Sequence, residues 1–326
     1  MAFPLNAYLL AFFGALVATA ASLPLWRAWC ERTGLVDDPG HRKIHHAPIP
    51  LAGGLAVFTG IALVVLGSVA VVQLQLLDKE AAEKLGHGLG RRGPQLIAIL
   101  FGALGMVVLG WWDDRHDLRP AVKFAGQCAV ALLVAAAGVR VTLFVPSLLF
   151  SYAVTVLWIV TVTNALNFND NMNGLCGGLG LVAAAWIAFL AARNGQYLVA
   201  SLALLVAGAL AGFLPYNFPR ASVFLGDSGS HLVGYLLAVL AILPHFYSAK
   251  LAAPSRLAVL SPLFILAVPL VDLARVVCVR TLAGRPFWLG DTNHLSHRLV
   301  RAGLTKPQAV GVLWAAAAVA GSLALL

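Results

Sequence analysis

About ten long apolar runs follow one another along this chain of 326 residues, and they limit its fold more than any other feature. Each run has roughly the 17 to 25 apolar residues that a helix needs to cross a bilayer. Because 60% of the residues are hydrophobic and only 11% are charged, a water-soluble core could not bury them. The sequence predicts an all-α, polytopic integral membrane protein with a single domain over residues 1–326. The runs fall at 4–29, 51–77, 94–112, 121–138, 141–165, 175–193, 196–215, 228–248, 256–279 and 308–326.

The loops between these runs differ in charge. The odd-numbered loops, after runs 1, 3, 5, 7 and 9, hold most of the Lys and Arg, so the positive-inside rule places them in the cytoplasm. All but three of the 13 carboxylates, Asp78, Glu80 and Glu83, belong to the same set of loops. An even number of spans puts both termini on the non-cytoplasmic side of the plasma membrane. We therefore expect a site for a cation and a phosphorylated substrate at the cytoplasmic face.

Other classes of protein fit the sequence poorly. The four cysteines are scattered, with no CxxC and no histidine at metal-ligand spacing, so neither a zinc site nor a disulfide framework is indicated. The net charge of +9 comes without a compact basic stripe, so nucleic acid is not an expected partner. The first run has no basic residue before it and is too long for a signal-peptide core, which predicts a retained first span.

The third odd loop, NALNFNDNMNGL from Asn164 to Leu175, places several asparagines and one aspartate between two spanning runs. Polar groups at the mouth of an apolar bundle are costly unless they are used or partnered. In a helix, Asn167, Asp170 and Asn173 would lie along one face, because they are spaced at i, i+3 and i+6. The alternative is a polar loop that caps helix ends.

The first and second odd loops carry further candidates. In HRKIHHAPIPLAGG, the side chains of Arg42, Lys43 and His45 are suitable donors to phosphate oxygens, and Gly53 and Gly54 would allow close backbone approach. The alternative is topology-setting charge followed by a turn.

In GWWDDRHDLRPAVKF, Asp113 and Asp114 end one run, and Lys123 starts the next. The adjacent carboxylates repel unless a cation or a proton lies between them, although such pairs often mark only a solvated helix end. Mg²⁺ takes one or two carboxylates plus substrate phosphates, which fits this loop.

The fourth and fifth odd loops complete the set. Asp227 directly precedes a run that begins SGSH, where helical N–H groups favour phosphate, and the alternative is a helix cap. His294, His297 and Arg298 are spaced at i, i+3 and i+4, so one helical turn would present all three as a phosphate clamp. A single histidine would more often be structural.

Five motifs in this order resemble one family, the polyprenyl-phosphate N-acetylhexosamine-1-phosphate transferases, in its WecA/TagO-like branch. They are DDPGHRKIHHAPIPLAGG, WWDDRHDL with Lys123, NALNFNDNMNGL, NFPRASVFLGDSGS and GDTNHLSHRL. The resemblance spans nearly the whole chain. HLSHRL departs from the triple-histidine form of the MraY branch, which uses UDP-MurNAc-pentapeptide. Asn173 stands where bacterial members commonly have a second aspartate, which argues against a catalytic charge there.

The resemblance implies roles for individual residues. Asp227 corresponds to the main Mg²⁺ ligand, with Mn²⁺ as an alternative ion, and Asn167 to a second ligand. Asp113 and Asp114 correspond to the pair that handles the lipid phosphate, and Lys123 to the lysine that holds it. The remaining positions correspond to catalytic Asp170 and to substrate-binding Asn173, Asn217, Phe224, His294, His297, Arg298, Arg42, Lys43 and His45.

The reaction implied is transfer of N-acetylglucosamine 1-phosphate from UDP-GlcNAc to undecaprenyl phosphate, with release of UMP, at the start of a cell-envelope polysaccharide pathway. Direct attack by the lipid phosphate on the β-phosphate is favoured over a covalent intermediate. Other UDP-HexNAc donors are the nearest alternative, and an ion-coupled transporter is a more distant one. The partners implied are the two substrates, the lipid bilayer and a second copy of the chain in a homodimer.

Overall fold

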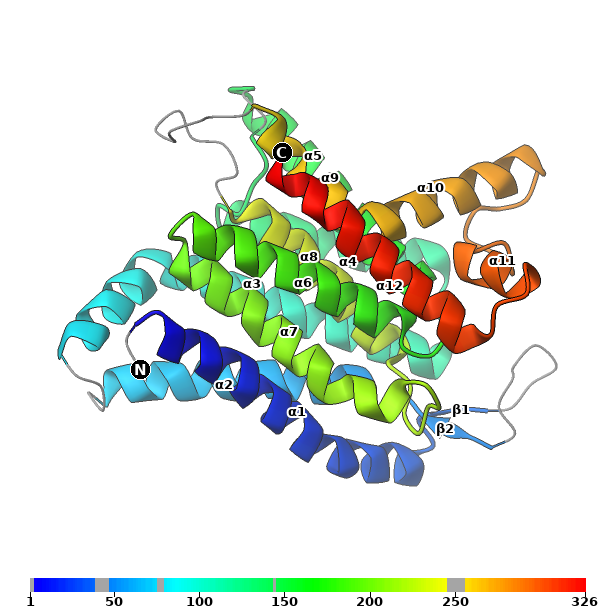
Figure 1. The fold of residues 1–326 in the computed structure, drawn as a ribbon, viewed down its shortest axis with the longest axis horizontal. Helices are drawn as coiled ribbons and strands as arrows, with labels where there is room; N and C mark the ends of the chain where they lie inside the picture. Colours follow the sequence, from blue (N-terminus) through cyan, green and yellow to red (C-terminus); the bar gives the residue numbers. More distant parts are fainter. Residues whose placement is uncertain (1–2, 39–46, 75–78, 143–144, 245–255) are drawn as a thin grey trace.

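The chain forms an elongated bundle of helices in the computed structural model, which describes residues 3–38, 47–74, 79–142, 145–244 and 256–326 (Figure 1). Two short strands and two 3₁₀ turns, η1 and η2, accompany the helices. The elements in order are α1 (Leu5–Thr33), β1 (Val36–Asp37), β2 (Ile49–Pro50), α2 (Gly53–Gln73), α3 (Lys79–His116), α4 (Pro120–Ala136), α5 (Leu148–Phe168), α6 (Leu175–Arg193), α7 (Tyr197–Asn217), α8 (Gly226–Ile242), η1 (Arg256–Leu260), α9 (Ser261–Ile265), α10 (Ala267–Leu282), α11 (Leu295–Arg301), α12 (Lys306–Ser322) and η2 (Leu323–Leu325).

The prediction of a helical, multi-pass membrane protein is confirmed. Within the described residues, seven helices are long and apolar enough to cross a membrane. The ninth predicted run is broken: α9 and α10 are bent by 69° at Leu266, and together they would make an eighth span. The fourth and eighth runs form α4 and α8, which are apolar but have only 17 residues each. A count of ten full spans therefore stays a prediction.

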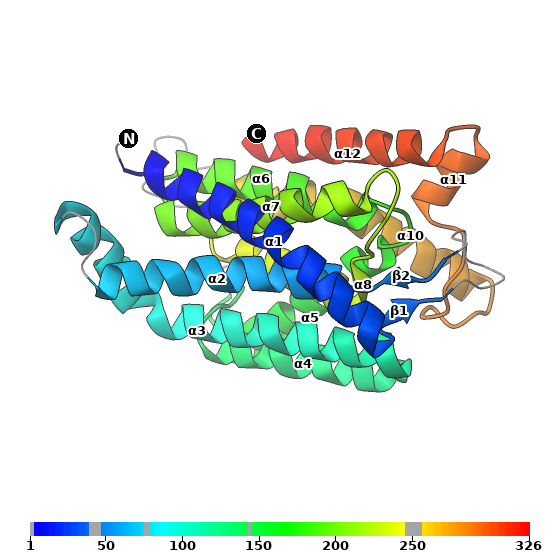
Figure 2. The ribbon, with the colours of Figure 1, turned by 90° about the horizontal axis from the view of Figure 1, so that it is seen from below.

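Helix α8 is the centre of the bundle, with α2, α3, α5 and α6 packed around it (Figures 1 and 2). Nearly all of its side chains from Gly226 to Ala241 are buried. The outer helices instead expose large apolar side chains such as Leu66, Phe101 and Leu157. Exposed apolar side chains on the outside of a helical bundle suit contact with lipid tails. The polar groups at the start of α8 therefore lie at one end of the most enclosed helix.

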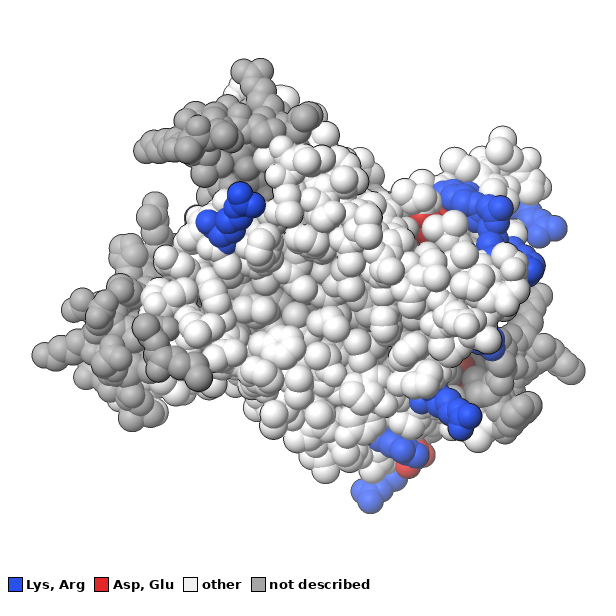
Figure 3. Space-filling model, viewed as in Figure 1, with Lys and Arg blue, Asp and Glu red and all other residues white. Residues whose placement is uncertain are grey.

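The loops predicted to share one face do gather at one end of the bundle. Figure 2 shows β1, β2 and α11 together at that end, whereas the N-terminus and the C-terminal end of α12 lie toward the other. On the face in Figure 3, most blue Lys and Arg side chains also lie at the β1, β2 and α11 end, and the middle is white. We call this the site end of the bundle. Which side of a membrane it faces stays a prediction.

The first odd loop is tied to the start of α8 through backbone hydrogen bonds. Strands β1 and β2 pair antiparallel, with Val36 opposite Pro50. Phe224 N then donates to Pro50 O at 2.9 Å, and Gly54 N donates to Leu225 O at 3.0 Å. A Cβ on Gly54 would lie 2.3 Å from Gly229 N. The close approach expected at Gly54 is therefore to the protein's own backbone.

Helices α3 and α8 approach closely at Gly110, and substitution there should disturb the site end. A Cβ on Gly110 would lie 2.3 Å from Asp227 O and 2.4 Å from Ser228 N, so backbone would have to move. We expect Gly110→Ala to destabilise the protein by about 1–3 kcal/mol, as overpacking does. Gly93→Ala is the matched control, because a Cβ at Gly93 would meet nothing within 4 Å. Thermal unfolding of both purified variants checks this, and equal midpoints would contradict it.

Candidate active site

The centre of the site is an ion-pair cluster where α3, α4, α5 and α8 meet. The Lys123 ammonium, in the first turn of α4, pairs with Asp113 and, at 2.8 Å, with Oδ2 of Asp227. Asn167 Nδ2 donates to the other carboxylate oxygen of Asp227 at 2.7 Å and to Ser230 Oγ at 2.9 Å. Four side chains predicted from three different loops are thus brought into one cluster.

Asp113 and Asp114 are adjacent in sequence but have different partners. Asp113 is buried, and its Oδ1 accepts from Leu118 N at 2.9 Å, which fixes the turn after α3. Asp114 instead accepts from the N–H groups of Asp227 at 2.8 Å and Ser228 at 3.1 Å. The carboxylate of Asp114 therefore caps the N-terminus of α8 and occupies a favourable end of its dipole. The sequence suggested that the two carboxylates share a cation between them. In the structure they instead turn to different partners.

Gly226 makes this cap possible. Its φ of +73° lies in the left-handed region that side chains with a Cβ rarely adopt. A Cβ there would also lie 2.8 Å from Oδ2 of Asp114. The GDSGS stretch therefore starts α8 on a glycine turn, and Asp227 is displayed in the first helical turn beside Lys123. The cap of α8 comes from Asp114 on α3, so the alternative in which Asp227 serves only to cap its own helix is not what the structure shows.

Asp170 follows α5 and lies close enough to two of these carboxylates to be affected by them. Burial, together with the negative charges of Asp227 and Asp114, raises the pKa of Asp170 to about 8. The carboxyl is therefore mostly protonated at neutral pH, whereas an exposed aspartate would be ionised. A divalent cation near Asp227 would favour the ionised form of Asp170.

The raised pKa of Asp170 predicts a pH-dependent stability. The folded state holds a proton that the unfolded state has already lost, so stability falls as pH rises from near 4 toward 8. In EDTA, the unfolding temperature of Asp170→Asn should fall less steeply between pH 5 and pH 8 than that of the wild type. Parallel curves for the two proteins would show that Asp170 does not carry this dependence.

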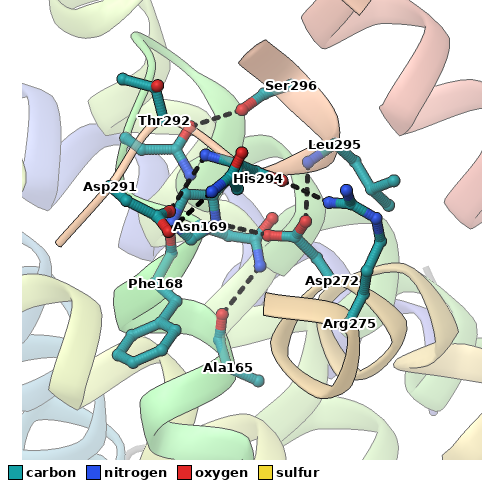
Figure 4. A network of polar contacts seen from close by, with 12 residues as sticks. Ala165, Phe168, Asn169, Asp272, Arg275, Asp291, Thr292, His294, Leu295 and Ser296 are labelled. Carbon is teal, nitrogen blue, oxygen red and sulfur yellow. Dashed lines mark hydrogen bonds and ion pairs between the residues drawn. The ribbon is translucent and has the colours of Figure 1, made fainter. Parts of the chain in front are cut away.

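A second polar network holds the fifth odd loop in place (Figure 4). His294 Nδ1 donates to Oδ2 of Asp272 at 2.7 Å, and Leu295 N donates to Oδ1 of Asp272 at 2.7 Å. The side chains of His294 and Asp272 are both buried. Asp272 comes from α10, so this pair joins the broken span to the loop and sets the orientation of the His294 ring.

An ion pair between Arg280, near the end of α10, and Asp291 holds the same loop against that helix. Arg280 Nη2 pairs with Asp291 Oδ1 at 3.1 Å, and its Nη1 donates to Phe287 O at 2.6 Å. Although burial acts in the opposite direction, the hydrogen bonds from Arg280 and Asn293 hold the pKa of Asp291 well below its usual range. The guanidinium also lies over the Phe168 ring, 5.2 Å from its centroid. Arg275 adds a hydrogen bond to Asn293 O.

The end of α5 joins the two networks. Asn167 contacts Asp227, whereas the next residue, Phe168, packs edge-on against His294 with ring centroids 6.1 Å apart. Asn171 Oδ1 accepts from Ser296 Oγ at 2.6 Å, which ties the third loop to α11. The NALNFNDNMNGL stretch therefore lies between the ion-pair cluster and the histidine loop.

The predicted histidine clamp is formed in part. His294 is the N-cap residue of α11, and its ring lies 6.3 Å from that of His297. Arg298 is exposed. Burial, with the neighbouring His294 and the positive charges of Arg301 and Lys306, lowers the pKa of His297, which favours the neutral form of this ring. The clamp would therefore offer His297 as a neutral hydrogen-bond partner rather than a cation.

The other predicted positions fall into three groups. Asn217 is buried, accepting from Gly174 N at 2.6 Å and donating to Val223 O at 3.0 Å, so it holds two loops together. Asn173 donates to Pro219 O at 3.3 Å, and Phe224 is partly exposed in the loop before α8. Arg42, Lys43 and His45 lie outside the described residues. Their roles in binding substrate stay predictions.

Sequence reasoning missed Asp272, Arg275, Arg280, Asp291, Asn171 and Ser296. Asp272 carried one signal, since it is a carboxylate inside an apolar run, where a charge must be partnered. Asn171, Asp291 and Ser296 lie within the quoted motifs NALNFNDNMNGL and GDTNHLSHRL but were not singled out there. Arg275 and Arg280 had no local signal, because they resemble ordinary charges at the end of an apolar run until the fold brings their partners to them.

The donor set of the cluster suits a hard cation. In the described part of the chain, no three His, Cys, Asp or Glu side chains gather closely enough to hold a metal unaided. Mg²⁺ is commonly held by one or two carboxylates and completed by substrate phosphates. The Asp227 side chain is 31% exposed, and the Asn167 amide contacts its carboxylate, so the two side chains fit this pattern.

Comparison with known proteins decides the family. Residues 96–245 match Glycosyl transferase family 4. The chain is 33% identical to a probable undecaprenyl-phosphate N-acetylglucosaminyl 1-phosphate transferase of Bacillus subtilis strain 168, over 93% of this chain and 80% of the relative. This chain belongs to the polyprenyl-phosphate N-acetylhexosamine-1-phosphate transferase family.

Two further relatives have similar names. Decaprenyl-phosphate N-acetylglucosaminephosphotransferase of Mycobacterium tuberculosis H37Rv is 33% identical, over 88% of this chain and 74% of the relative. Undecaprenyl-phosphate alpha-N-acetylglucosaminyl 1-phosphate transferase of Escherichia coli K12 is 30% identical, over 92% of this chain and 78% of the relative. The chain is therefore a membrane transferase of a family that acts on polyprenyl phosphates, and the transporter alternative loses its basis.

Proposed function

We propose that this transferase moves N-acetylglucosamine 1-phosphate from UDP-GlcNAc to undecaprenyl phosphate at the cytoplasmic face of the plasma membrane and releases UMP. The observation that carries the proposal is the cluster of Lys123, Asp113, Asp227 and Asn167 at the mouth of an apolar bundle. Because the outer helices expose large apolar side chains to a bilayer, a phosphate on a lipid tail would reach this position from the membrane. The relatives' names favour GlcNAc as the sugar.

The lipid phosphate would bind at Lys123, whose ammonium already lies between two carboxylates. Asp113 fixes that ammonium, because its own carboxylate is buried and anchored to Leu118 N. The phosphate oxyanion is itself the nucleophile, so the protein need only position it and offset its charge. Direct attack on the β-phosphate of the donor fits these residues, since none of them has to be consumed covalently.

Asp227 and Asn167 would hold Mg²⁺, or Mn²⁺, against the donor diphosphate. The bound ion would supply charge neutralisation for the diphosphate and the departing UMP. Asp114 and Gly226 keep Asp227 at the start of α8, and Asn167 orients its carboxylate. Asp170, protonated at neutral pH in the structure, would become ionised beside the bound cation and add to the negative surface that holds it.

The fifth odd loop would close on the sugar-diphosphate side. Asp272 holds His294 by Nδ1, which leaves Nε2 of the ring available to a phosphate oxygen. His297 lies next to it as a neutral donor, and the exposed Arg298 could reach a nucleotide phosphate. Asn173, Phe224 and the loop before α8 would face the nucleoside.

A donor panel tests this function. Purified protein in detergent, with Mg²⁺ and undecaprenyl phosphate, would be incubated separately with UDP-GlcNAc, UDP-GalNAc, a deoxy-amino UDP-sugar and UDP-MurNAc-pentapeptide. We expect UMP release and a lipid product of the mass of undecaprenyl-diphospho-GlcNAc with the first donor. If another donor reacts faster, the sugar assigned to this enzyme would change but the type of reaction would stay the same. No lipid product with any donor would refute the proposal.

A further inference from the structure

Directly below the ion-pair cluster, each of its helices α4, α5 and α8 carries one more polar side chain facing its neighbours. Gln127 lies one turn after Lys123 on α4, and His231 one turn after Asp227 on α8. Asn164 lies one turn before Asn167 on α5. Residues four or three apart occupy the same face of a helix. The three residues Gln127, Asn164 and His231 therefore repeat the arrangement of the cluster one turn deeper, and we call them the lower layer.

The lower layer is joined across all three helices by side-chain hydrogen bonds. Asn164 Nδ2 donates to Gln127 Oε1 at 2.6 Å and to Val160 O at 2.8 Å. Gln127 Nε2 donates in turn to His231 Nε2 at 3.3 Å. One chain of bonds thus runs from α5 through α4 to α8.

These groups lie where polar side chains are expensive. His231 is 0% exposed and Gln127 1% exposed, within a bundle whose other buried residues are mostly apolar. A buried polar group costs about 1–3 kcal/mol when it lacks a partner, so apolar residues would suit a purely packing role better. His231 Nδ1 has no hydrogen-bond partner among the described residues, so only Nε2 of the ring serves the network. The ring's polarity is therefore directed at Gln127.

We propose that Gln127, Asn164 and His231 are positioning residues that set the rotation of α4, α5 and α8 and so hold Lys123, Asn167 and Asp227 in their bridging arrangement. This inference rests on the proposed function only where its test measures kcat. A small rotation of any one helix would separate the Lys123 ammonium from Asp227 or Asn167 from the same carboxylate. The apolar contacts of these helices are far less directional than hydrogen bonds, so the lower layer is what specifies the rotation.

The test compares variants that keep volume but remove hydrogen bonds. Gln127→Met and His231→Phe should each lower kcat by about tenfold to a hundredfold, as small misplacements do, with KM for UDP-GlcNAc changed much less. Combining them should cost little more than either alone, because both break the same bond. Gln127→Glu should keep near wild-type kcat, because its carboxyl group can make the same two contacts. Thr163→Val is the matched control, since Thr163 adjoins Asn164, is buried, and its hydroxyl has no partner among the described residues.

A second readout does not depend on turnover. Binding of Mn²⁺ to the purified protein without substrates, followed by electron paramagnetic resonance, should weaken several-fold in Gln127→Met and His231→Phe but not in Thr163→Val or Gln127→Glu. Size-exclusion profiles and unfolding temperatures identify any variant that fails to fold. Asn164→Leu is a third variant of the lower layer. If one of Gln127→Met, His231→Phe and Asn164→Leu does not fold, the other two provide the test.

The outcomes separate the two proposals. Folded Gln127→Met and His231→Phe variants with wild-type kcat and Mn²⁺ binding would overturn the positioning role. The positioning role would also be overturned if Gln127→Glu or Thr163→Val lost as much kcat and Mn²⁺ binding as Gln127→Met and His231→Phe. The effect would then come from packing and not from the hydrogen bonds. If the wild type makes no lipid product with any donor, the proposed function fails, and the Mn²⁺ series alone still supports or overturns the lower layer.

Discussion

Asp227→Asn is expected to lower kcat for UMP release by on the order of a thousandfold, close to 4 kcal/mol of transition-state stabilisation. Asp227 is the residue that the other parts of the cluster serve: Lys123 pairs with one of its oxygens, and Asn167 donates to the other. Asparagine would keep the shape and still accept from Asn167, but it would lose the charge that holds a divalent cation and balances Lys123. The measurement is UMP release from UDP-GlcNAc with undecaprenyl phosphate, at saturating Mg²⁺.

Two comparisons make the Asp227→Asn result specific. Glu31→Gln also removes one carboxylate charge, but Glu31 is exposed on α1 and pairs with Arg27, so its activity should stay at the wild-type level. The unfolding temperature of Asp227→Asn should stay near that of the wild type, because the cap on α8 comes from Asp114 and the Asp227 backbone. A wild-type rate in folded Asp227→Asn would remove this residue from the centre of the site.

Asp272→Asn is expected to lower kcat/KM for UDP-GlcNAc by about a hundredfold or more, by analogy with other His–Asp pairs in which the carboxylate is neutralised. The substituted amide could still accept from Leu295 N with its carbonyl oxygen, but its NH₂ group would then face Nδ1 of His294. The ring would lose the carboxylate that stabilises its charged form when a phosphate approaches Nε2. Steady-state kinetics with the UDP-sugar varied would measure the loss.

The Asp272 effect should act through His294. His294→Ala should cost a similar factor, and the double variant should be hardly worse than either single one, because each removes the same pair. Cys278→Ser is the control on the same helix, since Cys278 is exposed. Additive losses in the double variant would mean that Asp272 has a separate role, such as holding α10 at its bend.

Much of the site could be predicted from sequence because its residues interrupt apolar runs. Asp113, Lys123, Asn167 and Asp227 all lie at ends of such runs, and the structure brings them within contact of one another. The adjacent Asp113 and Asp114 could not be separated in this way. Which carboxylate turns to Lys123 and which to the start of α8 depends on how α3 rotates against α8, and that rotation depends on the close contact at Gly110.

The fifth loop shows the limit more sharply. His294 and His297 were evident from their spacing, but their support comes from Asp272, 22 residues earlier on a helix bent away from its own first half. Pro269 has no N–H to donate to Ile265 O, which favours a break between α9 and α10, but the apolar run continues through it and gives no sign of the angle. Arg280 and Asp291 likewise form their ion pair only because the loop folds back over the end of α10.

By itself the sequence determined that this chain is a helical membrane protein, that its polar loops alternate with apolar runs, and which side chains stand at the ends of those runs. These properties are local, because hydrophobicity and spacing act over a few turns of one helix. Only the tertiary structure decided the partners: Asp114 with the N-terminus of α8, Asp272 with His294, and Gln127 with both Asn164 and His231. A hydrogen bond between helices depends on their rotation and separation to a fraction of an ångström, and those depend on contacts, polar and apolar, between residues far apart in the sequence.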